Sequence, residues 1–207
     1  MSRPLLAIVM LVMLSAAPMA RAAANTDPDW PCVQRKVPEI SIGQVWNGGE
    51  IPETAKEWDK DPQVSDLAAE LAKRANPIEN VRKQVLDYAS TLPKDQASEK
   101  LEQLFMGVFD KLNIERGQII SGISRYAEKQ RELAADIRKK ASEVDKMRAA
   151  SDTDPAELAK HDEQLTWETR IFEERVQSLT YVCEVPTLIE QRLYSVSKII
   201  NETMQKK

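Results

Sequence analysis

The sequence predicts an all-α protein in which a base bundle of short helices supports a long antiparallel helical (coiled-coil) hairpin, preceded by an irregular N-terminal arm that contains Trp and Pro. Two observations lead to this prediction. The 207 residues are 5% aromatic and 30% charged, a composition typical of helices that share narrow apolar seams. Apolar residues also recur every seven positions through the second half of the chain, which is the spacing of a coiled coil.

Residues 1–24 have the pattern of a cleavable export signal. Arg3 precedes an apolar run at 5–14, and small residues follow, so we expect cleavage near Ala22 or Ala24. The run is shorter than the roughly 20 apolar residues that a membrane-spanning helix needs. We therefore expect a periplasmic or secreted protein with no stable membrane insertion after signal cleavage.

The mature chain contains two cysteines, Cys32 and Cys183. In an oxidising compartment, two cysteines in one chain favour a disulfide between them. Closing a loop of about 150 residues stabilises the folded state by roughly 5 kcal/mol in the chain-entropy model. We therefore expect this disulfide to tie the N-terminal arm to the last helix.

The charge balance argues against nucleic acid as a partner. Removal of the signal takes away Arg3 and Arg21, which leaves 27 basic and 33 acidic residues and a net charge of −6. An acidic protein is repelled by phosphate backbones and by anionic lipid surfaces. We expect the partner to be a protein of the cell envelope.

Residues 25–60 are predicted to form an extended arm, because prolines at positions 28, 31 and 38 interrupt any helical period. Three of the four tryptophans, Trp30, Trp46 and Trp58, lie in this segment. They either cover the end of the helical bundle or form a recognition strip for a partner. We favour the first interpretation, because an arm tied by Cys32 needs a surface to pack against. All three tryptophans stay candidate partner-binding residues.

Residues 61–112 are predicted to form the three short helices of the base bundle. Asp61 and Asn76 each precede a proline, which is the pattern of an N-cap followed by proline at the first helical position. The third helix is expected to begin near Asp95 and to end at 112. Asn113 and Gly117 either mark a break or kink before the next segment or sit inside a continuous helix, at a cost of about 1 kcal/mol for the glycine.

Residues 113–207 are predicted to form the long hairpin, whose last part returns to the base. Two heptad seams flank a polar turn at 150–153, and Asp154 caps the second helix in front of Pro155. So short a connection can bury both seams only if the two helices fold back antiparallel. The first seam comprises Ile119, Ile123, Tyr126, Gln130, Leu133, Ile137, Lys140, Val144 and Met147, and the second comprises Leu158, Leu165, Phe172, Leu179, Pro186, Leu193 and Ile200.

The length of the turn also predicts the register of the hairpin. Ile123 is expected to face Leu179, and Ile119 to face Cys183, which lies at the base of the hairpin. The disulfide would then bring the arm to this level. Pro186 is expected to kink the last helix, because proline lacks a backbone N–H.

The sequence predicts no catalytic residue, no cofactor and no metal site. His161 is the single histidine, and a metal site needs several ligands. The polar seam residues Gln130, Lys140, Glu168 and Arg175 are interpreted as setting the register of the hairpin, since this is the usual effect of polar residues in a seam.

These features favour an exported, non-enzymatic helical protein that binds another protein in the periplasm, as a scaffold, adaptor or accessory subunit, through the hairpin or through the arm. The alternative is a periplasmic holdase-type chaperone. A helical enzyme or a small-ligand binder is a third hypothesis. The seam that continues past Cys183 to Ile200 would also allow a homo-oligomer.

Overall fold

The computed structural model describes residue 27 and residues 29–206, and the predicted signal peptide lies outside these residues. The described residues form helices and no strand, so the all-α class is confirmed. The elements are α1 (Ile42–Val45), the 3-10 helix η1 (Glu53–Lys60), α2 (Pro62–Ala72), α3 (Ile78–Thr91), α4 (Ala97–Ala149) and α5 (Pro155–Met204).

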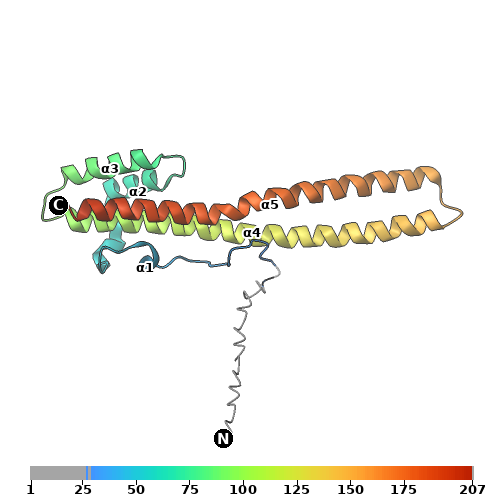
Figure 1. Cartoon of the computed structure of the whole chain (residues 1–207), viewed down its shortest axis with the longest axis horizontal. Helices are drawn as coiled ribbons and strands as arrows, with labels where there is room; N and C mark the ends of the chain where they lie inside the picture. The colour runs from blue at the N-terminus through green and yellow to red at the C-terminus, as the bar shows by residue number, and fades with distance from the viewer. Residues whose placement is uncertain (1–26, 28, 207) are drawn as a thin grey trace, which may run out of the picture.

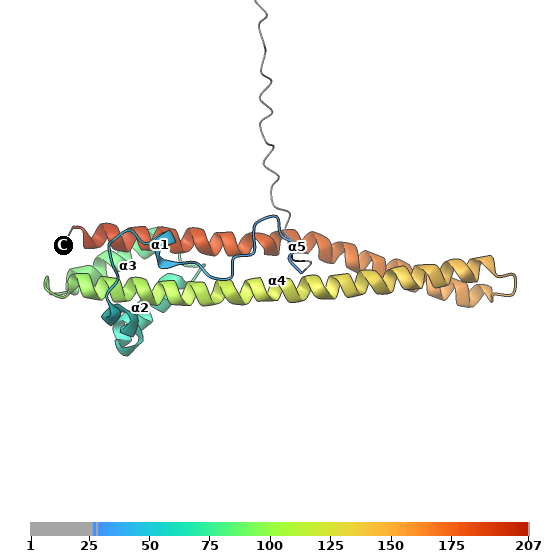
Figure 2. The ribbon, with the colours of Figure 1, turned by 90° about the horizontal axis from the view of Figure 1, so that it is seen from below.

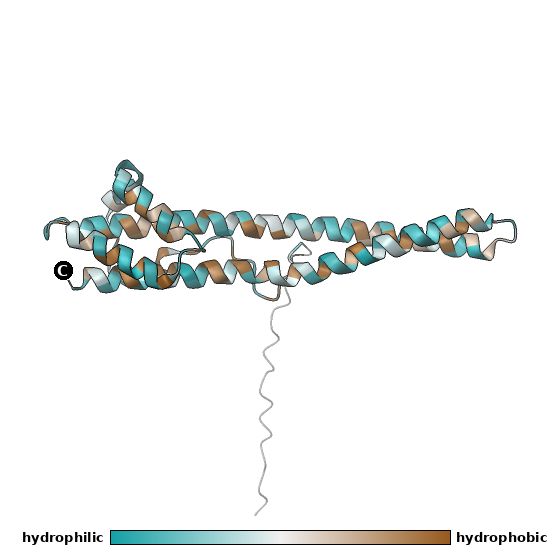
Figure 3. Ribbon diagram, turned by 90° about the horizontal axis from the view of Figure 1, so that it is seen from above, coloured by the Kyte–Doolittle hydropathy of each residue, from teal (hydrophilic) through white to brown (hydrophobic). Residues whose placement is uncertain are grey.

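Two long helices span the molecule from end to end (Figure 1). α4 has 53 residues and α5 has 50, which corresponds to about 75–80 Å for each helix. They run antiparallel and side by side in both views (Figures 1 and 2). Hydrophobic residues alternate with hydrophilic ones along both helices (Figure 3), as expected for helices that bury one face.

The prediction of a separate third short helix is wrong. It is the first part of α4, which continues through Asn113 and Gly117 without a break. Neither residue stops the helix, because the glycine costs only about 1 kcal/mol in a helix interior while neighbouring side chains such as Leu112 and Arg116 are buried. The base of the molecule is therefore built from α2, α3 and η1 packed against the two long helices.

The main core lies at the end of the molecule that holds the C-terminus. α2 and α3 lie on one side of the pair of long helices, and the arm with α1 lies on the other side (Figure 1). Full burial of each large side chain stabilises the fold by about 1.5–3 kcal/mol. The largest fully buried side chains of this core include Leu71, Leu101, Leu104, Phe105, Leu112, Ile189, Leu193 and Ile200.

Two of the predicted helix caps are confirmed and one is not. The Asp61 carboxylate accepts hydrogen bonds from the backbone N–H groups of Gln63 (2.9 Å) and Val64 (3.3 Å), and Asp154 caps α5 in the same way. Asn76 does not cap α3, because the Asn76 amide instead donates to the carbonyl of Glu70, at 3.2 Å. It closes the turn after α2.

Arg192 fastens α2 to α5. Its guanidinium donates to the backbone carbonyls of Leu71 (2.6 and 3.1 Å), Ala72 (3.2 Å) and Asn76 (2.8 Å). The last carbonyls of a helix have no partner within the helix. The side chain of Arg192 supplies the missing donors from a neighbouring helix.

Polar side chains of α4 hold the arm in place. The Asn113 side chain accepts a hydrogen bond from the N–H of Ile40 at 3.0 Å and donates to the carbonyl of Ile40 at 3.3 Å. The buried Arg116 donates to the carbonyls of Val37 and Pro38 and, through Nε, to Glu190 at 2.8 Å. Asn113 therefore anchors the arm, where the sequence suggested a break in the helix.

The disulfide between Cys32 and Cys183 forms, with an S–S distance of 2.02 Å. It belongs to a second buried cluster that contains Trp30 and side chains of both long helices: Ile119, Ile120, Ile123 and Leu179. Ile123 and Leu179 thus belong to one cluster, together with Ile119 and Cys183. The arm crosses the long helices at this level.

α5 remains helical across Pro186, which is buried. The helix bends about midway along its length (Figure 1). A proline inside a helix removes one backbone hydrogen bond and crowds the preceding turn. Pro186 lies in this part of α5 and accounts for the bend.

Replacing both cysteines, as Cys32→Ser/Cys183→Ser, is expected to lower the free energy of unfolding by up to about 5 kcal/mol, because the closed loop no longer restricts the unfolded chain. Urea unfolding followed by circular dichroism compares the variant with the oxidised wild-type protein. The wild-type protein in reductant should unfold like the variant. Unchanged urea midpoints in both samples would contradict this stabilisation.

Asn113→Leu is expected to lower the free energy of unfolding by about 2 kcal/mol, because the N–H and carbonyl of Ile40 lose their partners. The matched control is Ile114→Ala at the next position, where the side chain is 61% exposed. The control should change stability by less than about 0.5 kcal/mol. Equal losses in the two variants, measured by the same urea titration, would show that Asn113 does not anchor the arm.

Candidate protein-binding surfaces

The three tryptophans of the arm are covered by the rest of the molecule. Trp30 and Trp46 are only 5% and 7% exposed. Trp46 stacks on Phe105 with ring centroids 4.2 Å apart. Trp58 is partly buried, and its indole N–H donates to Asp110 at 2.8 Å. These side chains pack on the helices and leave little indole surface for a partner.

The exposed tryptophan is the fourth one, Trp167 on α5, at 63%. Tyr181 and Leu188 on the same helix are 74% and 51% exposed. The three residues are separated by multiples of seven positions, so they lie on one face of α5. Each follows a seam position by two residues, which places it away from α4.

These residues belong to a second seam of α5, which we call the outer seam. Ile171 and Val185, both partly buried, fill the gaps in alternating steps of four and three residues. Five of the seven positions are apolar or aromatic, which makes the outer seam comparable to the seam that faces α4. The outer seam comprises Trp167, Ile171, Glu174, Ser178, Tyr181, Val185 and Leu188.

The distal part of the hairpin buries little. Between residues 128 and 182, only Gln130 and Val144 are classed as buried. The seam side chains Leu158, Leu165 and Phe172 are only partly buried, since two helices alone cannot enclose a seam. This part of the molecule therefore contributes little to the core.

Polar pairs join the two helices of the distal hairpin. Lys140 Nζ lies 2.6 and 2.8 Å from the two carboxylate oxygens of Glu168, and Arg148 pairs with Asp162 nearer the turn. Gln130 is buried, and its side-chain amide has no hydrogen-bond partner within the described part of the chain. The side chain of Arg175 is exposed, and the backbone carbonyl of Arg175 accepts a hydrogen bond from the hydroxyl of Tyr126.

A groove borders the disulfide where the arm crosses α5, and we call it the disulfide groove. Its volume is about 510 Å³. Val33 of the arm is fully exposed, and Val176 of α5 is 45% exposed. The groove is lined by Pro31, Val33, Gln34, Val176, Leu179 and Thr180, together with Glu184 and the disulfide itself. Both the arm and the hairpin thus supply apolar side chains to one accessible surface.

A second groove of about 330 Å³ lies between α4 and α5 near the same level. Its walls include Ile123, Tyr126, Leu179 and the exposed Val182. Leu179 lines both this groove and the disulfide groove. Accessible apolar side chains therefore gather on both sides of Leu179, around the level of the disulfide.

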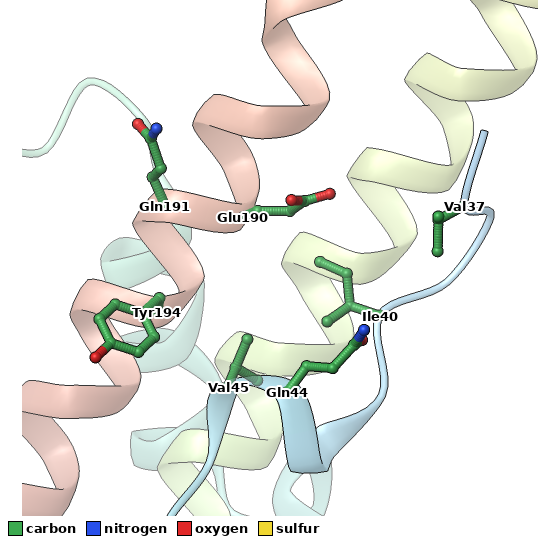
Figure 4. A pocket seen from close by; sticks show the side chains of 7 residues that line it. All are labelled: Val37, Ile40, Gln44, Val45, Glu190, Gln191 and Tyr194. Carbon is green, nitrogen blue, oxygen red and sulfur yellow. The ribbon is translucent and has the colours of Figure 1, made fainter. Parts of the chain in front are cut away.

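An open pocket of about 370 Å³ lies between the arm and α5 in the base (Figure 4). Figure 4 shows the Glu190 side chain directed toward α4, where Arg116 holds its carboxylate. Glu190, the charged residue of the lining, is therefore already paired. Gln191 and Tyr194 lie on α5 at the edge of the pocket. The full lining is Val37, Ile40, Gln44, Val45, Glu190, Gln191 and Tyr194.

The described residues contain no group of three or more His, Cys, Asp or Glu side chains arranged to hold a metal ion. His161 is exposed on α5 near the turn. Over residue 27 and residues 29–206, none of the helices has the length and hydropathy of a membrane span. No family model, curated protein or solved structure matches this chain.

The outer seam has a signal in the sequence that the prediction of a single seam did not include. Trp167, Tyr181 and Leu188 repeat at the heptad spacing, offset by two residues from Leu165 and Leu179. The disulfide groove had no comparable signal. It exists because the tertiary structure places Val33 beside α5.

The hairpin is expected to lose stability at acid pH through Glu168. Hydrogen bonds from Lys140 and then Gln164 hold the pKa of the Glu168 carboxyl below its usual value of 4.5. A lowered pKa in the folded state stabilises the fold above pH 4.5, and this contribution is lost as the pH falls through the lowered value. Glu168→Gln should therefore unfold at a lower temperature than the wild-type protein at pH 7.

The difference in unfolding temperature between the wild-type protein and Glu168→Gln should shrink as the pH falls below about 4.5. Glu168 is then protonated first in the unfolded chain and, at lower pH, in the folded protein as well. Thermal unfolding by circular dichroism from pH 7 to pH 3 measures this difference. Glu163→Gln, an exposed neighbour on α5, is the matched control and should follow the wild-type protein throughout. A difference that stays constant with pH would show that the ion pair is not its cause.

Proposed function

We propose that this is an exported, non-enzymatic protein that binds another protein of the cell envelope through the disulfide groove. The single observation that supports this proposal most is the exposure of Val33 and Val176 on two chain segments that one disulfide holds together. Exposed apolar side chains gathered in a groove are typical of protein-binding surfaces.

The construction of the groove also supports a binding role. Val33 is next to Cys32 in the chain, and Gln34 donates a hydrogen bond to the carbonyl of Cys183. The arm segment that lines the groove is therefore held by the side chains of Cys32 and Gln34, on either side of Val33. A surface that is ordered before the partner arrives binds at a smaller cost in conformational entropy.

The outline of the molecule fits an adaptor or accessory subunit better than a compact enzyme. The core lies in the base, while the distal hairpin extends beyond the disulfide with few buried side chains. A long helix pair of this kind separates a binding surface from the base. The export signal expected at 1–24 would bring the protein to a compartment in which the disulfide forms.

Affinity recovery from native periplasmic extract, read by mass spectrometry, tests the proposal. The wild-type protein carries a C-terminal tag and is compared with Val33→Asp/Val176→Asp, which places charge in the groove. We expect the variant to recover at least about tenfold less partner, the effect of losing hot-spot contacts. The matched control is Val37→Asp, an exposed valine of the same arm outside this groove.

Equal recovery of the same partner by the wild-type protein and Val33→Asp/Val176→Asp would refute binding at the disulfide groove. Circular dichroism of each variant checks that the fold is retained. Reduction of the disulfide should lower recovery as well, because Val33 is then no longer held beside α5.

A holdase-type chaperone is the second candidate, because the same exposed apolar grooves could accept unfolded chains. The two candidates differ in the range of proteins bound. Suppression of aggregation of several unrelated unfolded proteins, measured by light scattering, would favour the chaperone. A flat aggregation curve together with one recovered partner would favour the adaptor.

A further inference from the structure

α5 has two apolar seams, and only one of them faces α4 along the whole hairpin. The outer seam runs from Trp167 to Leu188 in steps of four and three residues. A helix that packs against one neighbour needs one seam, and a second seam is typical of a helix with a second neighbour. Three residues of the outer seam, Trp167, Tyr181 and Leu188, are more than half exposed.

The continuation of the outer seam into the base does have a neighbour. The next positions in the same spacing include Arg192 and Ile199. Arg192 binds the carbonyls at the end of α2, and Ile199 is buried in the main core. α2 and α3 thus cover this side of α5 in the base, and the cover stops where the exposed part of the seam begins.

We propose that a second copy of this chain covers the outer seam, with the two α5 helices antiparallel about a twofold axis between Glu174 and Ser178. In an antiparallel coiled coil, the two seam positions of one helix face the opposite positions of the other. Ile171 then lies opposite the partner's Tyr181, and Trp167 lies opposite the partner's Val185. Twofold symmetry makes each of these contacts twice.

The centre of this arrangement is polar but self-complementary. Glu174 lies opposite the partner's Ser178, whose hydroxyl can donate a hydrogen bond to the carboxylate. A twofold axis placed at Glu174 itself would instead bring two carboxylates together. The polar layer therefore favours one register over its neighbours, as single polar layers do in coiled coils.

In the same register, one flank of the outer seam carries complementary charges, while the other flank places Arg175 opposite the partner's Arg175. Arg170, Gln177 and Glu184 recur every seven residues, and each directly precedes a position of the outer seam. The antiparallel pair places Arg170 opposite the partner's Glu184 on the complementary flank. In the single chain Arg170 pairs with Glu174 at 3.0 Å, and both side chains are exposed, so this pair is weak and readily replaced.

The proposed dimer goes beyond the proposed function and leaves most of the disulfide groove open, although Glu184 belongs both to the groove lining and to the dimer flank. Val176 and Thr180 line the groove and lie more than a third of a turn around α5 from the outer seam, at 100° per residue. Two helices in such a contact cross at about 20°.

Sedimentation equilibrium of the purified, oxidised, signal-processed protein tests the proposal. We expect a monomer–dimer equilibrium, and Trp167→Glu/Tyr181→Glu should raise the dissociation constant about a hundredfold or more, since aromatic anchors dominate such interfaces. The matched control is Ile114→Glu/Tyr194→Glu, which also introduces two carboxylates at exposed apolar positions. Neither position belongs to the outer seam. A wild-type monomer at 100 µM concentration, or a dimer unaffected by the seam variant, would overturn the proposal.

A charge exchange tests the register. Arg170→Glu and Glu184→Arg should each weaken the dimer by roughly five- to tenfold, and the double variant should restore it, because each contact occurs twice and is partly screened by solvent. Single variants without effect, or a double variant that adds the two losses, would rule out this pairing.

A cysteine at the twofold axis gives a second, independent reading of the register. Gln177 lies opposite the partner's Gln177, so Gln177→Cys should be joined to its own copy by a short bis-maleimide. Glu173→Cys, an exposed position on another face of α5, is the control. Equal cross-linking of the two variants would overturn the proposed register. Because these experiments use purified protein, their failure is distinct from failure to recover a partner from extract.

Discussion

The disulfide between Cys32 and Cys183 is the constraint on which the arrangement of the N-terminal arm depends. It joins positions 151 residues apart and restricts the unfolded chain more than a short crosslink would. In the folded state it holds the arm across α5 at the level where the main core ends. Hydrogen bonds from Asn113 and Arg116 then hold the following arm residues along α4. The disulfide groove exists because these contacts leave the apolar side chain of Val33 outside the cluster and beside Val176.

The two ends of the molecule are held together by different interactions. In the base, α2 and α3 enclose the long helices, and large side chains such as Phe105 and Leu193 are fully buried. In the distal hairpin, two helices share a partly open seam, and an ion pair between Lys140 and Glu168 joins them. Solvent screening limits what such a pair contributes. The distal hairpin should therefore open locally before the base unfolds.

α5 connects the two proposals. One side of it faces α4, a second side lines the disulfide groove, and a third side carries the outer seam. The outer seam is covered by α2 and α3 in the base, whereas Trp167, Tyr181 and Leu188 are exposed and Val185 between them packs against the main core. A dimer through this seam would present two disulfide grooves, and a partner with two binding segments would then bind with a gain from effective concentration.

The amino-acid sequence by itself determined the all-α class, two helix caps and the cysteine pair. The helical features depend on local patterns: a capping residue before proline and heptad spacing. The sequence also contains the outer seam, which lies two residues after the seam that faces α4 and was not predicted. Because patterns of this kind repeat along one helix, they can be recognised without knowing what lies nearby.

Only the tertiary structure decided the continuity of α4, the burial of Trp30 and Trp46, and the disulfide groove. Asn113 and Gly117 lower local helix propensity, but packing in the base outweighs that preference. Asn113 turns out to bind the backbone of Ile40, 73 residues away in the chain, and Val33 lies beside α5 only because Cys32 is bonded to Cys183. Such contacts join segments that are far apart in sequence, and no local spacing encodes them.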